Sequence, residues 1–179
     1  SMAGPMNSNV TEMIFGISKG SPFMVGAVLR GFIESKAIEF VPNVGWVQTA
    51  EHRSRDVSTD AASILIQRLL LLPETHFRSL ALAAVWGKEF EITPLSELLN
   101  ISMQQLSAIF DEVESRNIVL RTIKSDVRVF VHDKLREATL SLVAEDEKIK
   151  HHLSIANYLE NKRPSEIFQI AFHFDAANQ

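Results

Sequence analysis

Apolar residues recur at helical spacing along most of the chain, and they alternate with polar residues in two short regions only. Two apolar runs flank the turn residues 42–45, Pro-Asn-Val-Gly, which are typical of a β-hairpin. A second pair of runs, at 118–123 and 127–132, is separated by Lys-Ser-Asp. The pattern therefore predicts a mainly α fold with two small β-hairpins.

The N-terminal part is predicted to contain two helices. The first covers residues 10–18 and ends at Lys19-Gly20, where glycine can take the left-handed conformation that terminates helices. The second starts at Ser21-Pro22, because serine is a good N-cap and proline suits the first helical position.

The central part is predicted to contain four helices before the second hairpin. A helix from Asp60 ends at Pro73, and the next has an apolar face and ends at Gly87. A short helix at 94–99 takes Thr93 as its cap, and Ser102 opens the fourth with a capping box to Gln105. Three helices followed by a two-stranded ribbon are the order of a winged helix.

The C-terminal part is predicted to form three helices, at 134–143, 147–161 and 165–177, with hairpin packing. The last has an apolar face that is expected to await a partner: Ile167, Ile170, Ala171 and Phe174. The predicted organisation is an expression remnant and disordered start (1–9), lid helices with a hairpin (10–49), a linker (50–59), a winged-helix domain (60–133) and C-terminal helices leading into helical repeats (134–179).

Composition narrows the class of protein. The chain has 179 residues, 46% of them hydrophobic, which is enough for one or two compact modules. A net charge of -4 gives no general attraction to nucleic acid or anionic lipid. The chain has no cysteine, which excludes disulfides, and no apolar run approaches the roughly 20 residues of a membrane span. A cytoplasmic protein without a membrane partner is expected.

Catalytic motifs are missing from the sequence. Gly87-Lys88 is followed by Glu89, so the phosphate-binding P-loop is not completed, and no zinc-binding H-E-x-x-H occurs. His151 and His152 are adjacent and point about 100° apart on a helix, so we interpret them, with His76 and His173, as surface features. The chain is predicted not to be an enzyme and to hold no metal.

The most informative segment is the junction at residues 127–133, where an apolar strand runs into His132-Asp133. Val127, Val129 and Val131 fall on one face of the strand, and Asp133 is placed to cap the helix that follows. An imidazole held at such a corner can donate to a phosphate. The alternative is that His132 bonds a neighbouring carbonyl.

A winged helix suggests DNA binding, so the charge of its helix at 102–117 matters. That helix carries Asp111, Glu112 and Glu114 against Arg116, and phosphates would repel it. The ribbon offers only a weak basic edge, made by Arg121, Lys124 and Arg128. We expect no specific DNA binding. The alternative function is a winged-helix DNA-binding module of a transcription regulator.

The segments GSPF at 20–23 and VHDKLREA at 131–138 together resemble the C-terminal lid and winged-helix part of signal-transducing ATPases with numerous domains (STAND), which include NB-ARC switches. The resemblance implies that Gly20, Ser21 and Pro22 form the motif whose proline contacts adenine. It also implies that His132 and Asp133 read the β-phosphate of bound ADP. Many relatives have asparagine at Ser21 and acidic or amide residues at Gly26 and Ala27, so the lid helix is expected to pack differently.

The resemblance also sets the expected cofactors and partners. The P-loop, the Mg²⁺-binding acidic strand and the sensor arginine of the family do not occur in this sequence, so no cofactor is expected in the fragment, and ADP or ATP with Mg²⁺ is expected in a longer parent. The expected partners are an upstream P-loop domain and downstream helical repeats, with weak self-association. The implied function is a non-catalytic regulatory fragment of a nucleotide-switched signalling ATPase that relays nucleotide state to an output domain such as a kinase.

Overall fold

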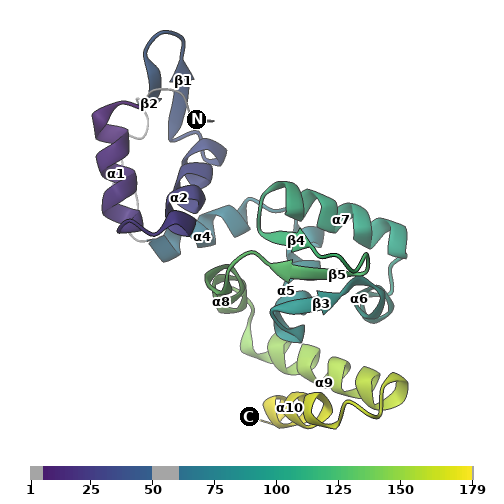
Figure 1. Cartoon of the computed structure of the whole chain (residues 1–179). Helices are drawn as coiled ribbons and strands as arrows, with labels where there is room; N and C mark the ends of the chain where they lie inside the picture. The colour runs from purple at the N-terminus through teal and green to yellow at the C-terminus, as the bar shows by residue number, and fades with distance from the viewer. Residues whose placement is uncertain (1–5, 50–60, 179) are drawn as a thin grey trace. The chain divides into compact units, whose positions relative to one another are not determined.

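The computed structural model describes residues 6–49 and 61–178, which divide into two compact units, Ser1–Leu71 and Leu72–Gln179. The described residues form mostly helices with two small antiparallel sheets, one of two strands and one of three (Figure 1). The predicted fold class, mainly α with small hairpins, is confirmed.

Within residues 6–49 and 61–71, the N-terminal unit contains three helices and one hairpin. Lys19, with φ 48°, ends the first helix as predicted, and Asn43, with φ 65°, makes the hairpin turn. The strands pair antiparallel, with Ile38 opposite Gln48. The elements are α1 (Ser8–Ser18), α2 (Pro22–Glu34), β1 (Ile38–Val41), β2 (Gly45–Gln48) and α4 (Ala61–Leu70).

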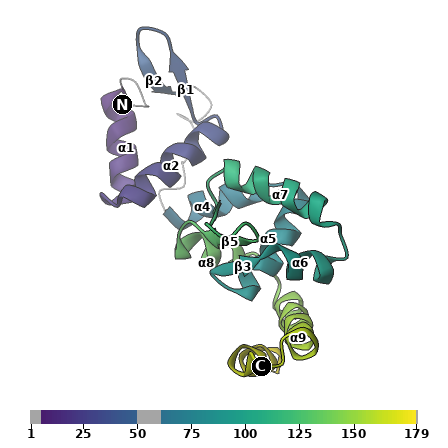
Figure 2. The same ribbon diagram turned by 45° about the vertical axis from the view of Figure 1, so that its right-hand side comes forward.

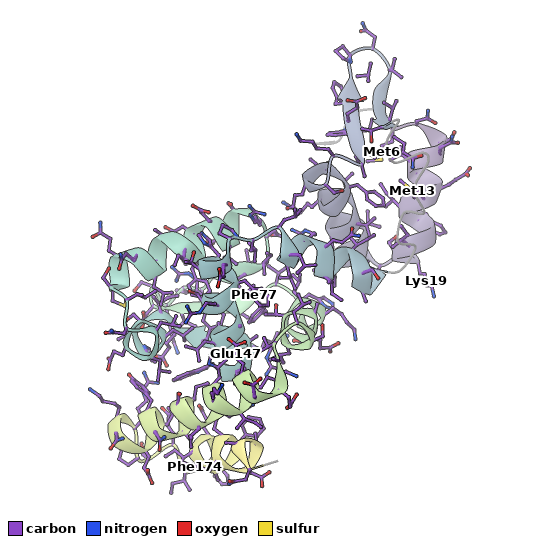
Figure 3. All side chains as sticks on the ribbon, turned by 180° about the vertical axis from the view of Figure 1, so that it is seen from behind. Met6, Met13, Lys19, Phe77, Glu147 and Phe174 are labelled. Atoms are coloured by element: carbon purple, nitrogen blue, oxygen red, sulfur yellow. The ribbon has the colours of Figure 1, made fainter. Side chains whose placement is uncertain are left out.

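The core of this unit is formed by apolar residues of α1, α2, β1 and α4, together with Ala37, which lies just before β1. Met6 and Met13 lie at its edge, where Figure 3 labels them. The helices α2 and α4 approach closely at Gly31, since a Cβ added there would lie 2.7 Å from a side-chain methyl carbon of Ile64. The buried core residues are Val10, Ile14, Ile17, Val28, Phe32, Ala37, Ile38 and Ile64.

The boundary between the units lies at Leu71 and Leu72, later than the sequence suggested. The helix α4, expected to open the second domain at 60–133, belongs instead with α2. Arg68, only 2% exposed, explains this placement because its guanidinium pairs with the carboxylate of Glu34 at 3.0 Å. The predicted linker at 50–59 lies outside the described residues. The predicted N-terminal remnant at 1–9 is described only from Met6, and Ser8 already begins α1.

The C-terminal unit begins with helices interleaved with a small sheet and ends with three further helices. Its strand order is β3-β5-β4, with both pairs antiparallel. The three-residue strand β3 was not predicted. The elements are α5 (Glu74–Trp86), β3 (Glu89–Glu91), α6 (Ile92–Leu99), α7 (Met103–Ser115), β4 (Val119–Arg121), β5 (Val127–Phe130), α8 (Asp133–Ser141), α9 (Glu145–Lys162) and α10 (Ile167–Ala177).

Three aromatic rings join the sheet to α7 in the core of this unit. Phe90 of β3 contacts Phe110 of α7 and Phe130 of β5, with ring centroids 5.1 and 5.7 Å apart. The helix α5 passes through the unit with every residue from Ser79 to Val85 buried. This central helix supports the sheet and the helices after it.

Helix starts in this unit match the sequence at one site and differ at another. Ser102 caps α7 through the predicted capping box with Gln105. The helix α6 begins at Ile92, two residues before the predicted start, so Thr93 lies inside its first turn. Asp126 explains the earlier start, because its backbone and side-chain oxygens accept hydrogen bonds from the N–H groups of Ile92 and Thr93.

The last two helices, α9 and α10, pack against each other as the predicted hairpin, and they lie side by side in Figures 1 and 2. The exposed apolar face of α10 differs from the predicted one. Ile167 and Ala171 are exposed as expected, but Ile170 and Phe174 are partly buried. Phe168, 93% exposed, and Phe172, 57% exposed, form a second stripe that was not predicted.

Among the helices in the described ranges, none combines the length and the apolar character that a membrane span requires.

Candidate functional site

The first candidate segment, Gly20 to Pro22, forms the sharp turn between α1 and α2. Gly20 has φ 78°, a conformation that favours glycine. Ser21 caps α2 with its extended backbone but makes no side-chain capping bond, and Pro22 occupies the first helical position. Gly20 and Pro22 are exposed, so this turn presents its proline ring at the surface of the N-terminal unit (Figure 3 labels the adjoining Lys19).

The second candidate segment, His132-Asp133, lies where β5 passes into α8. His132, not Asp133, is the N-cap: its Nδ1 atom accepts a hydrogen bond from the backbone N–H of Lys134 at 3.2 Å. Its backbone is extended, with φ -153° and ψ 145°, as N-cap residues usually are. The prediction that Asp133 caps this helix is wrong, because the helix already begins at Asp133.

Asp133 has a different partner. Its Oδ1 atom lies 3.0 Å from the Nζ atom of Lys88, and this hydrogen-bonded ion pair lowers the pKa of the Asp133 carboxyl. The carboxylate also sits in the first turn of α8, where the helix dipole favours a negative charge. Lys88 is itself held near the end of β5, since its carbonyl accepts from the N–H of Phe130 at 2.9 Å.

The strand before this corner, β5, is oriented by the face opposite to its valines, which carries Arg128 and Phe130. Arg128 and Phe130 point into the unit and are 3% and 1% exposed. Val129 and Val131, on the predicted valine face, are only half-buried, although Val127 is buried. The core therefore fixes the strand through Phe130 and, of the three valines, through Val127.

The helix that follows is fixed to α5. The Nε atom of Arg136 donates to the carbonyl of Ala84 at 2.8 Å, and burial lowers the pKa of Arg136. Leu135 and Ala138 are buried beside it. The His132 corner is thus held from both sides, by the sheet and by α5.

The two candidate segments belong to different units: Gly20, Ser21 and Pro22 to the N-terminal one, His132 and Asp133 to the C-terminal one. Their convergence on one nucleotide therefore stays a prediction.

Several histidines were wrongly interpreted as surface features. His173 is 2% exposed, and its Nδ1 atom lies 2.8 Å from that of His152 across the α9–α10 hairpin. Burial lowers the pKa of His173 to about 4 and also lowers that of His152. His76 pairs with Glu112 at 2.9 Å. Within the residues that the structure describes, no group of three or more metal-binding side chains occurs.

The basic edge of the ribbon is largely neutralised. Arg121 lies 2.5 Å from a carboxylate oxygen of Asp111 and 3.4 Å from one of Glu114, both on α7. Arg128 is buried and donates to the carbonyl of Ser125 at 2.8 Å. Among the described residues neither Arg128 nor Lys124 forms an ion pair, and of these two Lys124 is the exposed one.

A second site that the sequence did not reveal lies between α5, the ribbon and α10. It is a hollow of about 620 Å³ in which Arg163 and Glu91 form a two-bonded ion pair, at 2.6 and 2.7 Å. These residues are 72 positions apart, so no local pattern in the sequence connects them.

Comparisons with known proteins give one similarity. The chain is 22% identical over 193 residues to the hybrid signal transduction histidine kinase G of Dictyostelium discoideum. The match covers 86% of this chain but 6% of that kinase. No protein-family model and no solved structure matches the chain.

Proposed function

We propose that this chain is a non-catalytic regulatory segment of a longer, nucleotide-switched signalling protein of the STAND type. In this proposal the segment α5 to β5 acts as a winged helix, and His132 reports the nucleotide state. The observation that carries the proposal is the rigid corner at His132. This histidine follows the core strand β5 and caps α8, and α8 is itself fixed to α5.

The capping bond determines what His132 can offer a phosphate. Because Nδ1 accepts from the N–H of Lys134, the proton of the neutral ring lies on Nε2. Nε2–H is then the donor for a phosphate oxygen, and its direction is set by the cap. A donor in a fixed direction loses little conformational entropy on binding, which suits a sensor.

The order of elements supports the winged-helix part of the proposal. Helices α5, α6 and α7 are followed by the ribbon β4–β5, and β3 adds a third strand next to β5. The similarity to a hybrid histidine kinase agrees with a place in signal transduction, but 22% identity over a small part of that protein is modest support.

The proposal names partners and cofactors outside this chain. An upstream P-loop domain would supply ADP or ATP with Mg²⁺, and Gly20, Ser21 and Pro22 would contact the adenine. Downstream helical repeats would continue from the α9–α10 hairpin along the stripe of Ile167 and Ala171, which are exposed. The output domain, such as a kinase, would respond to the resulting rearrangement.

DNA binding is the alternative function, and the charges disfavour it. Arg121 is engaged by Asp111 and Glu114 of α7, so the ribbon and that helix present little positive charge to phosphates. A specific site typically binds DNA at 10⁻⁸ M or tighter. Enrichment of one duplex sequence from a random pool, with such an affinity at about 0.15 M salt, would favour the alternative.

The decisive experiment uses the longer protein with His132→Ala and His132→Ser. Serine preserves the helix cap but is too short to replace the imidazole, so it separates the two roles of His132. We expect both variants to bind ADP more weakly, by roughly one to two orders of magnitude, since a hydrogen bond to a charged group contributes about 1.5 to 3 kcal/mol. Basal output should rise, because the ADP state would lose its stabilising contact.

Unchanged ADP affinity in His132→Ser would overturn the proposal. ATP turnover by the purified 179-residue chain itself, retained after repeated purification, would overturn its non-catalytic part.

A further inference from the structure

Two hollows meet at the face of the C-terminal unit formed by α5, β3 and α10. Their volumes are about 620 and 270 Å³. Trp86, Glu89 and Gln169 line both, so the two hollows adjoin each other, and together they are called the groove. The larger end reaches the ribbon turn at Lys124–Asp126, and the smaller end reaches Phe168, Phe172 and His173.

The charges of the groove differ between its two ends. At the larger end Arg163 is bound by both oxygens of Glu91 and lies 3.5 Å from Glu166, so its positive charge is balanced by carboxylates. Asp126 is engaged with the N–H of Thr93. Glu89, which lies where the hollows meet, has no ion pair among the described residues. The groove thus holds an unbalanced carboxylate at its centre.

The smaller end is lined by aromatic rings. Phe168 and Phe172 are 93% and 57% exposed and lie one helical turn apart on α10, and Trp86 at the end of α5 lines the same hollow. Exposed apolar patches of this kind mark interaction sites. An aromatic ring attracts a cation over its face, and a carboxylate beside the rings adds direct charge attraction.

We propose that this groove binds a helical segment of a partner protein that inserts an arginine side chain between Trp86, Phe168 and Phe172, beside the carboxylate of Glu89. Arginine fits better than lysine because its planar guanidinium stacks on aromatic rings and can donate two parallel hydrogen bonds to a carboxylate. Leucines flanking the arginine would cover the exposed rims of Phe168 and Phe172.

The position of the arginine follows from the other charges. Lys124 lies at the larger end without an ion pair and would repel a second cation, whereas the smaller end contains no lysine or arginine. The inserted cation is therefore expected at the aromatic end. This inference needs only the C-terminal unit and does not depend on the nucleotide-switch proposal.

The test uses the whole chain and two fluorescein-labelled helical peptides, one of arginine and leucine at helical spacing and one with glutamate in place of each arginine. Fluorescence anisotropy should show saturable binding of the arginine peptide only. Glu89→Gln and Phe168→Ala should each weaken it by roughly tenfold, since a partly desolvated cation–aromatic or charge contact is worth about 1 to 2 kcal/mol.

Matched variants provide the controls. Glu160→Gln removes the same charge from an exposed position on α9, and Leu153→Ala removes an exposed apolar side chain from the same helix. Both should bind the peptide as the wild type does. Melting temperatures of all four variants would verify that folding is intact, which is expected because Phe168 is almost fully exposed.

Three outcomes would overturn the proposal: equal binding of the two peptides, equal effects of the groove and control variants, or no saturable binding. A chain dimer seen by sedimentation, lost in Phe168→Ala but kept in Glu89→Gln, would identify a second copy as the occupant and would also overturn it.

Discussion

Arg163, at the end of α9, binds both carboxylate oxygens of Glu91, at the end of β3, with N–O distances of 2.6 and 2.7 Å. The bond from Arg163 lowers the pKa of the Glu91 carboxyl, although its burial acts in the opposite direction. This pair joins the C-terminal helices to the sheet, so the unit is not a separate sheet domain followed by independent helices.

The first prediction concerns the stability of this junction. Arg163→Ala should lower the free energy of unfolding by about 1 kcal/mol, because the pair is bonded twice but only partly buried. Arg163→Lys should recover part of the loss, since lysine offers a single point charge. Urea unfolding at pH 7 measures both.

Lys162→Ala is the matched control, because Lys162 is mostly exposed and lies 3.6 Å from Glu97. It should change stability by less than about 0.5 kcal/mol. An equal loss of stability in Arg163→Ala and Lys162→Ala would show that the Arg163–Glu91 pair stabilises the unit no more than an exposed ion pair does.

Local features of the fold could be predicted from the sequence because their causes are local. The capping box of Ser102 and Gln105 and the helix end at Lys19 depend on neighbouring residues only. The strand β3 was not predicted because it has only three residues, of which Phe90 alone is buried, and three residues are too few to show an alternating pattern. It exists because β5 pairs with it.

The candidate site was predictable in position but not in detail. The sequence located the corner at His132 and Asp133, but it gave the cap to Asp133, the commoner capping residue. Which of two adjacent polar residues caps a helix depends on where the strand before it ends, and that end is set by pairing with β3 and β4. Contacts between distant elements, such as His152 with His173, leave no local pattern to detect.

A second prediction tests the close approach of α2 and α4. Gly31→Ala should destabilise the N-terminal unit by about 1 to 3 kcal/mol, because the added methyl group would lie 2.7 Å from Ile64 in a packed core. Gly26→Ala, in the same helix with nothing within 4 Å, should instead stabilise by about 0.5 to 1 kcal/mol. Denaturant unfolding compares the two, and stabilisation by both would show that the helices are not in close contact.

A third prediction tests the cap of α8. His132→Ala should lower the free energy of unfolding by about 1 kcal/mol, the usual contribution of an N-cap, while His132→Ser should keep most of it. Asp133→Ala should cost less than His132→Ala, since Asp133 makes an exposed ion pair with Lys88. A larger loss of stability in Asp133→Ala than in His132→Ala, measured by urea unfolding, would show that Asp133 caps the helix.

The last prediction concerns acid and the α9–α10 hairpin. His173 is buried against His152, and besides burial the positive charges of a protonated His152 and of Arg136 from α8 disfavour its protonation. For His152, burial and the charges of His151 and Arg136 disfavour protonation, while Glu145 at the start of α9 favours the charged form. The neutral pair satisfies itself with one hydrogen bond between the two Nδ1 atoms, one donating and one accepting. Protonation of both rings would remove the acceptor and place two charges 2.8 Å apart.

The sign of the effect follows from the direction of the pKa shift. The pKa of His173 falls from 6.5 to about 4 on folding, so the unfolded chain binds more protons between these values. The contribution of neutral His173 to the free energy of unfolding is therefore fully present above pH 6.5. It declines as the pH falls towards 4, by up to roughly 3 kcal/mol.

Urea unfolding at pH 7.5, 6 and 5 should show this decline in stability. His173→Gln should flatten the pH dependence even if that variant is less stable at every pH. His76→Gln, which removes a histidine paired with Glu112, should leave the decline in place. Equal pH dependence in His173→Gln and the wild type would show that this pair does not couple the hairpin to acid.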